Sequence, residues 1–307
     1  MKKEIYLPSS VDQLALHVLW MTPDHKKAKG IIQFCHGMSE HKERYEAVMR
    51  EFCHKGYICV IHDHRGHGKS IQKESDLGYF YDTTGNAIVE DTYLVSQWVK
   101  GQYENLPLHL FGHSMGSLVV RCYAKKYDDM IDSLIVCGSP SKNQAAGIAV
   151  GLAKILCFGN GKYKKGKVFH SMAIAAYEKM IPGENAWISF NQENVKAYNE
   201  NPLDGFMFTN NGFLNLFYLM KGTYHLRGWE VKNPDLPILF IAGEYDPCIV
   251  SKEKYKEAVD IMKKVGYKNI YAKLFTNRRH EILNEENPEE VYQVIEAFIE
   301  KRGDRIE

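Results

Sequence analysis

The chain has 307 residues, of which 45% are hydrophobic and 25% are charged, and its formal net charge is +1. This length suits one α/β domain with an insertion, and the near-neutral charge gives no electrostatic reason to expect a nucleic-acid partner. The seven cysteines are scattered without a CxxC spacing, which predicts reduced, buried thiols and not a disulfide framework.

The N-terminal segment has two lysines, Lys2 and Lys3, but no apolar run behind them, so no signal peptide is predicted. No stretch of the chain approaches the roughly 18 uninterrupted apolar residues of a membrane span. We therefore expect a cytoplasmic protein. The sequence does not predict its oligomeric state.

The first half of the chain alternates between apolar strand patterns and helical patterns. The predicted strands cover residues 14–21, 30–35, 57–61, 107–111 and 133–137. The predicted helices cover residues 43–55, 86–103 and 118–127. Because most of these strands are apolar on both faces, the pattern indicates a mostly parallel sheet with helices on each side.

The alternation stops after Pro140, and residues 141–227 carry helical patterns and loops without a convincing strand. It resumes with a strand at 237–242, a helix at 252–265, a strand at 270–275 and a helix at 288–301. The sequence therefore predicts an α/β core in two parts, 1–140 and 228–307. A helical cap, 141–227, is inserted between them.

The strongest chemical signal is Gly112-His113-Ser114-Met115-Gly116, a G-x-S-x-G pattern between a predicted strand and a predicted helix. A sharp strand-to-helix turn lifts the serine hydroxyl clear of the sheet and needs small flanking residues. The helix N-terminus also favours the negative charge that develops during acyl transfer. We therefore predict that Ser114 is a nucleophile.

A serine hydroxyl needs a base to take its proton, and the base needs an acid to orient it. His280 follows the last predicted strand, and Asp246 follows the strand at 237–242. Both positions lie at the carboxyl ends of strands, where open α/β sheets place their sites. We predict a Ser114–His280–Asp246 triad, with Glu244 as the alternative acid.

The negative charge of an acyl-transfer intermediate requires two main-chain N–H donors. One should be Met115, the residue after the nucleophile, and the other Met38, in the loop after the strand at 30–35.

A metal site at His62, His64 and His67 is an alternative function for the glycine-rich loop 63–70. The absence of a cysteine cluster argues against it, and Asp63 and Arg65 are expected to brace the loop. No cofactor or metal is predicted.

The segment 145–158 is apolar apart from Lys154. As a helix it would be about 20 Å long, too short for a bilayer core of ~30 Å. Two interpretations remain open for it. It is buried against the rest of the protein, or Ile148 and Leu152 line an acyl tunnel to Ser114 while the other side touches a lipid surface transiently.

Cys248 lies two residues beyond Asp246, in the same predicted loop. We expect its thiol to lie near the site, where a bulky thiol reagent would slow the reaction. The alternative is a buried, inert cysteine.

Five motifs together resemble the monoacylglycerol lipase and lysophospholipase family of α/β-hydrolases, and the resemblance extends over nearly the whole chain. They are His36-Gly37-Met38-Ser39-Glu40-His41 with Arg44-Tyr45, the loop Asp63-His64-Arg65-Gly66-His67-Gly68-Lys69-Ser70, Gly112-His113-Ser114-Met115-Gly116, Gly243-Glu244-Tyr245-Asp246-Pro247 and Arg279-His280-Glu281. In the cap, Asn201-Pro202 departs from the usual Asp-Pro of bacterial members.

The resemblance implies an α/β-hydrolase fold with about eight strands, a cap over the serine, and cleavage of monoacylglycerols, lysophospholipids or medium-chain acyl esters. Two alternatives remain. One is a serine peptidase of the proline-aminopeptidase type, for which Glu178, Glu184 and Glu193 are available to hold a substrate amino group. The other is a non-catalytic ligand-binding relative that has kept the fold.

Overall fold

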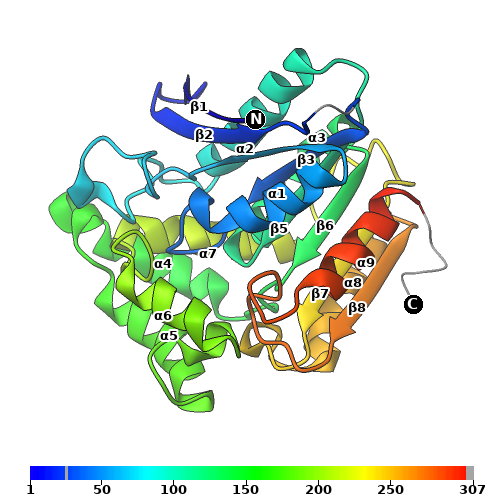
Figure 1. Cartoon of the computed structure of the whole chain (residues 1–307). Coiled ribbons are helices and arrows are strands. Elements are labelled where there is room, and N and C mark those ends of the chain that lie inside the picture. The colour runs from blue at the N-terminus through cyan, green and yellow to red at the C-terminus, as the bar shows by residue number, and fades with distance from the viewer. Residues whose placement is uncertain (25–26, 302–307) are drawn as a thin grey trace.

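The structure, a computed structural model, describes residues 1–24 and 27–301, without the side chains of 173–176. Eight strands form one sheet in the order β1-β2-β4-β3-β5-β6-β7-β8 (Figure 1). β2 pairs antiparallel with β1 and with β4, and every other pair is parallel. The strands are β1 (Lys2–Pro8), β2 (Ala15–Met21), β3 (Gly30–Cys35), β4 (Tyr57–His62), β5 (Leu108–His113), β6 (Ser133–Cys137), β7 (Ile238–Gly243) and β8 (Ile270–Phe275). The prediction of a mostly parallel sheet of about eight strands is confirmed.

Helices lie on both faces of this sheet (Figure 1). A further group of helices is inserted in the chain between β6 and β7. The helices are α1 (Glu46–His54), α2 (Ala87–Gln102), α3 (Met115–Tyr127), α4 (Ala146–Leu156), α5 (Lys167–Met180), α6 (Gln192–Glu200), α7 (Asn210–Tyr224), α8 (Lys252–Val265) and α9 (Glu289–Ile299). Residues 141–227, whose backbone is described throughout, hold α4 to α7 and no strand beyond one isolated bridge between Lys165 and Thr209. We call this segment the helical insertion.

The alternating side chains of the central strands build a core on each face of the sheet. Ile31, Leu110 and Val136 point to the face covered by α2, α3 and α8. Ile32, Phe111 and others point to the opposite face, which α1 and α9 cover. Burial on both faces explains why these strands are continuous apolar runs in the sequence.

Several elements differ from the sequence prediction, among them β1 and the start of α1. The edge strand β1 was not predicted, because its residues are mostly exposed and carry charges in place of an apolar pattern. The helix predicted at 43–55 begins as a 3₁₀ turn (Lys42–Tyr45) before α1. The strand β8 and the helix α8, which begins with Ser251 accepting the N–H of Lys254, keep their predicted bounds.

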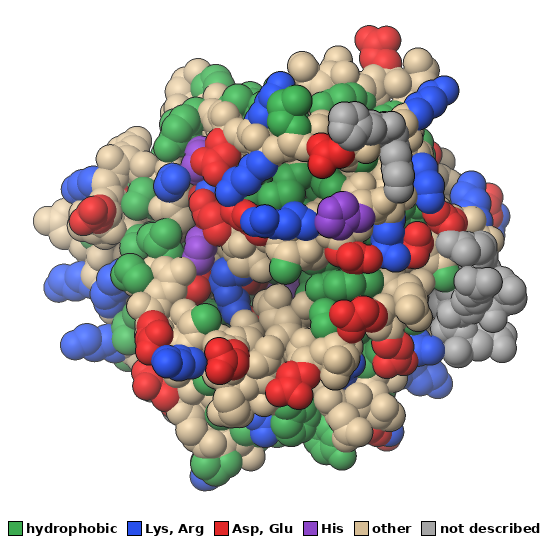
Figure 2. Space-filling view, viewed as in Figure 1, with side chains coloured by type: hydrophobic (Ala, Val, Ile, Leu, Met, Phe, Trp, Pro, Cys, Tyr) green, Lys and Arg blue, Asp and Glu red, His purple; other side chains and the backbone are tan. Residues whose placement is uncertain are grey.

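Helix α4 buries only its small side, through Ala146, Val150 and Ala153. Its larger side chains Ile148 and Leu152 point outward, with exposed fractions of 78% and 41%. The prediction that these two residues line an acyl tunnel is therefore wrong, because α4 turns its alanines and its valine inward. Lysine and arginine side chains project at the left edge in Figure 2, where the helical insertion lies in Figure 1.

Within the described ranges, no helix has both the length and the apolar character needed to cross a bilayer. The seven cysteines are all free thiols. Five of them are buried, in keeping with their expected use as small hydrophobic residues.

Candidate active site

Ser114 occupies the sharp turn between β5 and α3. Its φ of +52° and ψ of −118° lie outside the regions that side chains ordinarily adopt. Its N–H donates to the carbonyl of Cys137, and Ser117 Oγ donates to the Ser114 carbonyl at 2.6 Å. These bonds hold the strained residue in place, as the G-x-S-x-G pattern predicts.

The two glycines of the pattern are required by close backbone packing. A Cβ at Gly112 would lie 2.4 Å from the carbonyl oxygen of Gly116. A Cβ at Gly116 would lie 2.2 Å from the carbonyl oxygen of Cys35, at the end of β3. The start of α3 therefore rests directly on the loop that holds Met38.

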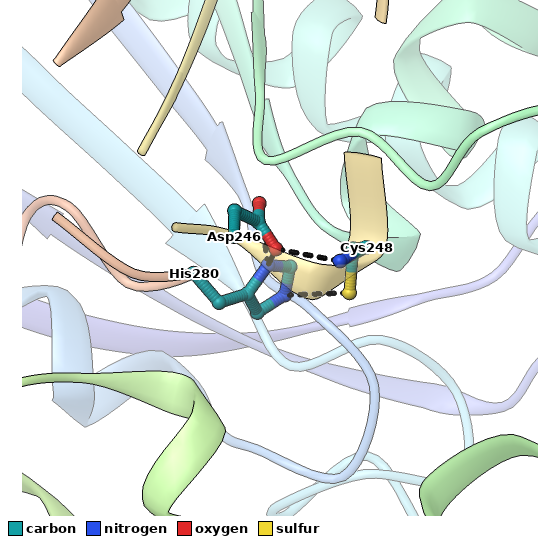
Figure 3. Close-up of side chains that lie close together, drawn as sticks. All are labelled: Asp246, Cys248 and His280. Carbon is teal, nitrogen blue, oxygen red and sulfur yellow. Dashed lines mark hydrogen bonds and ion pairs between the residues drawn. The ribbon is translucent and has the colours of Figure 1, made fainter. Parts of the chain in front are cut away.

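His280 and Asp246 come together at the carboxyl ends of β8 and β7. His280 Nδ1 lies 3.0 Å from each carboxylate oxygen of Asp246, and both residues are buried (Figure 3). Burial opposes the charged imidazolium, but the charge of Asp246 and its hydrogen bond outweigh it and raise the pKa of His280 above 6.5. The alternative acid, Glu244, instead pairs with Lys252 at 2.7 Å.

Cys248 lies beside the histidine, as the sequence predicted. Its Sγ is 3.9 Å from His280 Nε2, and its main-chain N–H donates to Asp246 Oδ1 at 2.8 Å (Figure 3). Burial and the charge of Asp246 raise the pKa of the Cys248 thiol well above its usual range. A thiol held protonated in this way is a poor nucleophile.

A cavity of about 380 Å³ opens over Ser114 and is also lined by Met38, Met115, Cys248 and His280. No hydrogen bond joins Ser114 Oγ to His280 in the described part of the chain. Such contacts are often long before substrate binds. The sequence analysis did not single out the apolar side chains that α7 contributes to this cavity: Leu216, Phe217 and Met220. Their helical spacing was the available signal.

The loop that holds Met38 is fixed on both sides. The N–H of Gly37 donates to the Glu40 carboxylate, and the N–H of Ser39 donates to His67 Nε2 at 3.3 Å. Among the described residues no acceptor takes the N–H of Met38. Met115 is the first residue of α3, a position whose N–H has no partner within the helix.

The buried histidines of the glycine-rich loop pack against this region. The N–H of His64 donates to His36 Nε2, and burial lowers the pKa of His62 and of His67 to about 3. Asp63 accepts the main-chain N–H groups of Lys42 and Lys69, and Arg65 donates to Asp91. The expectation that Asp63 and Arg65 brace the loop is confirmed.

A buried ionic cluster that the sequence analysis left without a role lies beside the histidine. Arg44 makes two hydrogen bonds to the Glu281 carboxylate, at 2.6 and 2.7 Å, and one to Glu40 at 3.1 Å. It also donates to Asn194 of α6. Through Arg44, Glu281, the residue next to His280, is linked to Glu40 of the core and to Asn194 of the helical insertion.

The loop between β8 and α9, residues 276–288, carries His280, and we call it the histidine loop. Arg279 donates to the carbonyls of Ala186 and Ser189. The Glu285 carboxylate accepts from Ser189 Oγ and from the N–H of Phe190. The stretch 186–194 of the insertion is therefore held against the histidine loop by several hydrogen bonds.

This sheet, with this cavity at the carboxyl ends of its strands, defines an α/β-hydrolase of the serine hydrolase class. A protein-family model described as serine aminopeptidase, S33, matches residues 26–287, and the chain belongs to that family.

The relatives point to the same kind of enzyme. A monoacylglycerol lipase of Mycolicibacterium smegmatis is 26% identical over 91% of this chain and 90% of its own length. A thermostable carboxyl esterase of Bacillus coagulans, solved in complex with glycerol, is 25% identical with a TM-score of 0.90 over 98% of both chains. A monoacylglycerol lipase of Paleococcus ferrophilus, 22% identical, shares the fold with a TM-score of 0.65 over 91% of this chain and 96% of its own. The prediction of a carboxylic ester hydrolase is confirmed at the level of enzyme class.

Proposed function

We propose that this protein hydrolyses small acyl esters, monoacylglycerols or lysophospholipids among them, through an acyl-enzyme formed on Ser114. One observation carries the proposal: His280 lies 3.0 Å from both oxygens of Asp246, in the cavity that also exposes the strained Ser114. The relatives named as monoacylglycerol lipase and carboxyl esterase support the choice of an ester substrate.

In the first half of the proposed reaction, Ser114 Oγ attacks the ester carbonyl carbon while its proton passes to His280 Nε2. Asp246 stabilises the imidazolium and holds its Nδ1–H. The N–H groups of Met38 and Met115 donate hydrogen bonds to the negatively charged oxygen of the tetrahedral intermediate. The alcohol then leaves with the proton from His280. In the second half His280 takes a proton from the water that attacks the acyl carbonyl carbon, and it returns this proton to Ser114 Oγ as the bond to the acyl group breaks and the acid leaves.

The acyl chain is assigned to the wall that α7 contributes to the cavity, at Leu216, Phe217 and Met220. Each buried methylene is worth about 0.8 kcal/mol, so the specificity constant should rise up to about fourfold per carbon. We therefore expect specificity to increase from acetyl toward medium-chain esters.

The experiment that tests the proposal measures kcat/KM for a panel of acetyl to dodecanoyl esters, monoacylglycerols, lysophospholipids and aminoacyl amides. Ser114→Ala should lower ester hydrolysis by several orders of magnitude and abolish labelling by a fluorophosphonate. The loss of ester hydrolysis in His280→Ala should equal that in Ser114→Ala within about tenfold, because triad members act as a unit. More than about a tenth of wild-type turnover in Ser114→Ala would contradict the proposal. An inert wild type would leave the non-catalytic ligand-binding alternative.

A pair of variants locates the acyl chain. Leu216→Asp places a charge in the cavity and should flatten the chain-length profile while acetyl ester cleavage continues. Ile148→Asp, on the exposed side of α4, is the matched control and should leave the profile unchanged. A flat profile in the wild type would leave a short-chain esterase.

One observation favours the peptidase alternative. Two of the three carboxylates named for it, Glu178 and Glu184, line the cavity of Ser114, whereas Glu193 lies on the exposed surface of α6. A pair of carboxylates could hold a substrate amino group. Cleavage of aminoacyl amides at a kcat/KM above that for every ester of the panel would establish this function in place of the first.

A further inference from the structure

The three side chains drawn in Figure 3 include three types of metal ligand. Asp246, Cys248 and His280 are all buried, and one ligand atom from each lies within 4.8 Å of the others. They are the one group of this kind within the described residues. The hydrolytic reaction uses Asp246 and His280 but gives the Cys248 thiol no role.

The geometry around His280 Nε2 suits a shared ion. Zn²⁺ binds sulfur at about 2.3 Å and imidazole nitrogen at about 2.0 Å, so one ion would join Cys248 Sγ and His280 Nε2 across their 3.9 Å separation with a bent S–Zn–N angle of about 130°. The other ring nitrogen, Nδ1, already faces the Asp246 carboxylate. A carboxylate behind a metal-bound histidine orients the ring and raises its basicity as a ligand.

The charges of the ligands and the access of water to them also favour a bound divalent ion. A Cys248 thiolate and the Asp246 carboxylate together balance the two positive charges of the ion. Binding releases the thiol proton to solvent as the Zn–S bond forms, and no oxidant or reductant is needed. Because Cys248 and His280 both line the 380 Å³ cavity, water can fill the remaining coordination positions.

We propose that Cys248 and His280, supported by Asp246, form an inhibitory site for a thiophilic divalent cation such as Zn²⁺. An ion on His280 Nε2 occupies the lone pair that must take the serine proton, so binding and catalysis exclude each other. The inhibitory consequence rests on the proposed function, whereas the binding itself does not. A soft thiolate with an imidazole selects Zn²⁺ over Mg²⁺ or Ca²⁺.

The first test titrates the purified protein with ZnCl₂ in buffer free of chelators and thiols while ester hydrolysis is followed. Zn²⁺ should inhibit reversibly, with EDTA restoring the rate, and MgCl₂ should not inhibit. In Cys248→Ala the half-inhibitory Zn²⁺ concentration, measured against that variant's own rate, should rise at least tenfold, since even outer-shell changes weaken metal binding about 10–100-fold. Cys157→Ala, which removes a half-buried thiol outside the cavity, is the matched control and should behave as the wild type.

The second test measures binding without activity. Ser114→Ala protein titrated with Co²⁺ should develop a thiolate-to-cobalt absorption band in the near ultraviolet, and adding Cys248→Ala should remove the band. Cys248→Ser replaces Cys248→Ala if the alanine variant does not fold. Equal Zn²⁺ sensitivity with and without Cys248, or no cobalt–thiolate band, would overturn the site. A band in a protein that cleaves no ester would keep the site and reject the proposed function.

Discussion

The surroundings of Ser114 and the outer side of α4 use the same residue types under opposite constraints. A Cβ at Gly116 would meet backbone at 2.2 Å, whereas a Cβ at Gly151 of α4 would meet nothing within 4 Å. Phe111 behind the site is fully buried, while Phe158 just beyond α4 is 90% exposed. Near the serine, packing dictates the residue type. On α4 packing leaves it free, so the apolar side chains there are not explained by the folded chain alone.

The largest difference in the free energy of unfolding between a buried and an exposed position is expected for charged side chains. Arg44→Met removes the cation that faces the buried carboxylates of Glu40 and Glu281 and should cost about 3–5 kcal/mol in the free energy of unfolding. Arg50→Met, whose side chain is 62% exposed beside Glu46, should cost no more than about 1 kcal/mol. Urea unfolding of both variants measures the two values. Equal losses would mean that the Arg44 cluster is no more stabilising than a surface pair.

A second comparison uses the packing of the turn itself. Gly116→Ala forces a methyl group onto the carbonyl of Cys35 and should destabilise the protein by up to about 3 kcal/mol. The displaced backbone carries Ser114 on one side and leads to Met38 on the other. The loss in kcat/KM for ester hydrolysis, converted to a free energy of activation, should therefore exceed the loss in the free energy of unfolding. Thermal unfolding and kcat/KM of the same sample check this. A stable, fully active Gly116→Ala protein would show that the turn can relax.

The third prediction concerns pH. The neutral imidazole of His280 accepts the serine proton, and its pKa is raised, so kcat/KM should fall as pH decreases through a midpoint above 6.5. Asp246→Asn removes the carboxylate that raises this pKa and should move the midpoint to lower pH. Glu244→Gln, whose carboxylate faces the exposed Lys252, should leave it in place. The assignment of the acid must be exchanged if Glu244→Gln moves the midpoint and Asp246→Asn does not.

The smallest effect is expected on α4. Gly151→Ala adds a methyl group in open space within a helix and should stabilise the protein by about 0.4–1 kcal/mol. Differential scanning calorimetry, with Gly116→Ala measured beside it, gives the sign of each change. A loss of stability in Gly151→Ala would mean that α4 packs against something in solution.

The sequence was informative where a local pattern and its structural context coincide. The strand-to-helix context of Ser114 and the strand ends before Asp246 and His280 led to two residues that line one cavity, Ser114 and His280, and to a third, Asp246, that contacts His280. The helix α8 and the strand β8 were predicted with their bounds, because a capping serine and an apolar run mark them locally.

The remaining features depend on contacts between distant parts of the chain. No sequence pattern around Arg44 predicts that it pairs with Glu281, which lies 237 positions away in the chain. The direction in which α4 faces was wrong for a related reason. A helix that is apolar on most sides has no sequence-encoded inner face, and the alanines that pack inward were outweighed in the pattern by the larger Ile148 and Leu152.

The hydrogen bonds between the histidine loop and the stretch 186–194 have a consequence for protein engineering. A chimera that exchanges the helical insertion for that of a related hydrolase would bring in foreign partners for Arg279 and Glu285. The base at His280 would then lose part of its support although its own segment was untouched. The natural unit of exchange is therefore the insertion together with the loop 276–288, two pieces of chain separated by β7, α8 and β8.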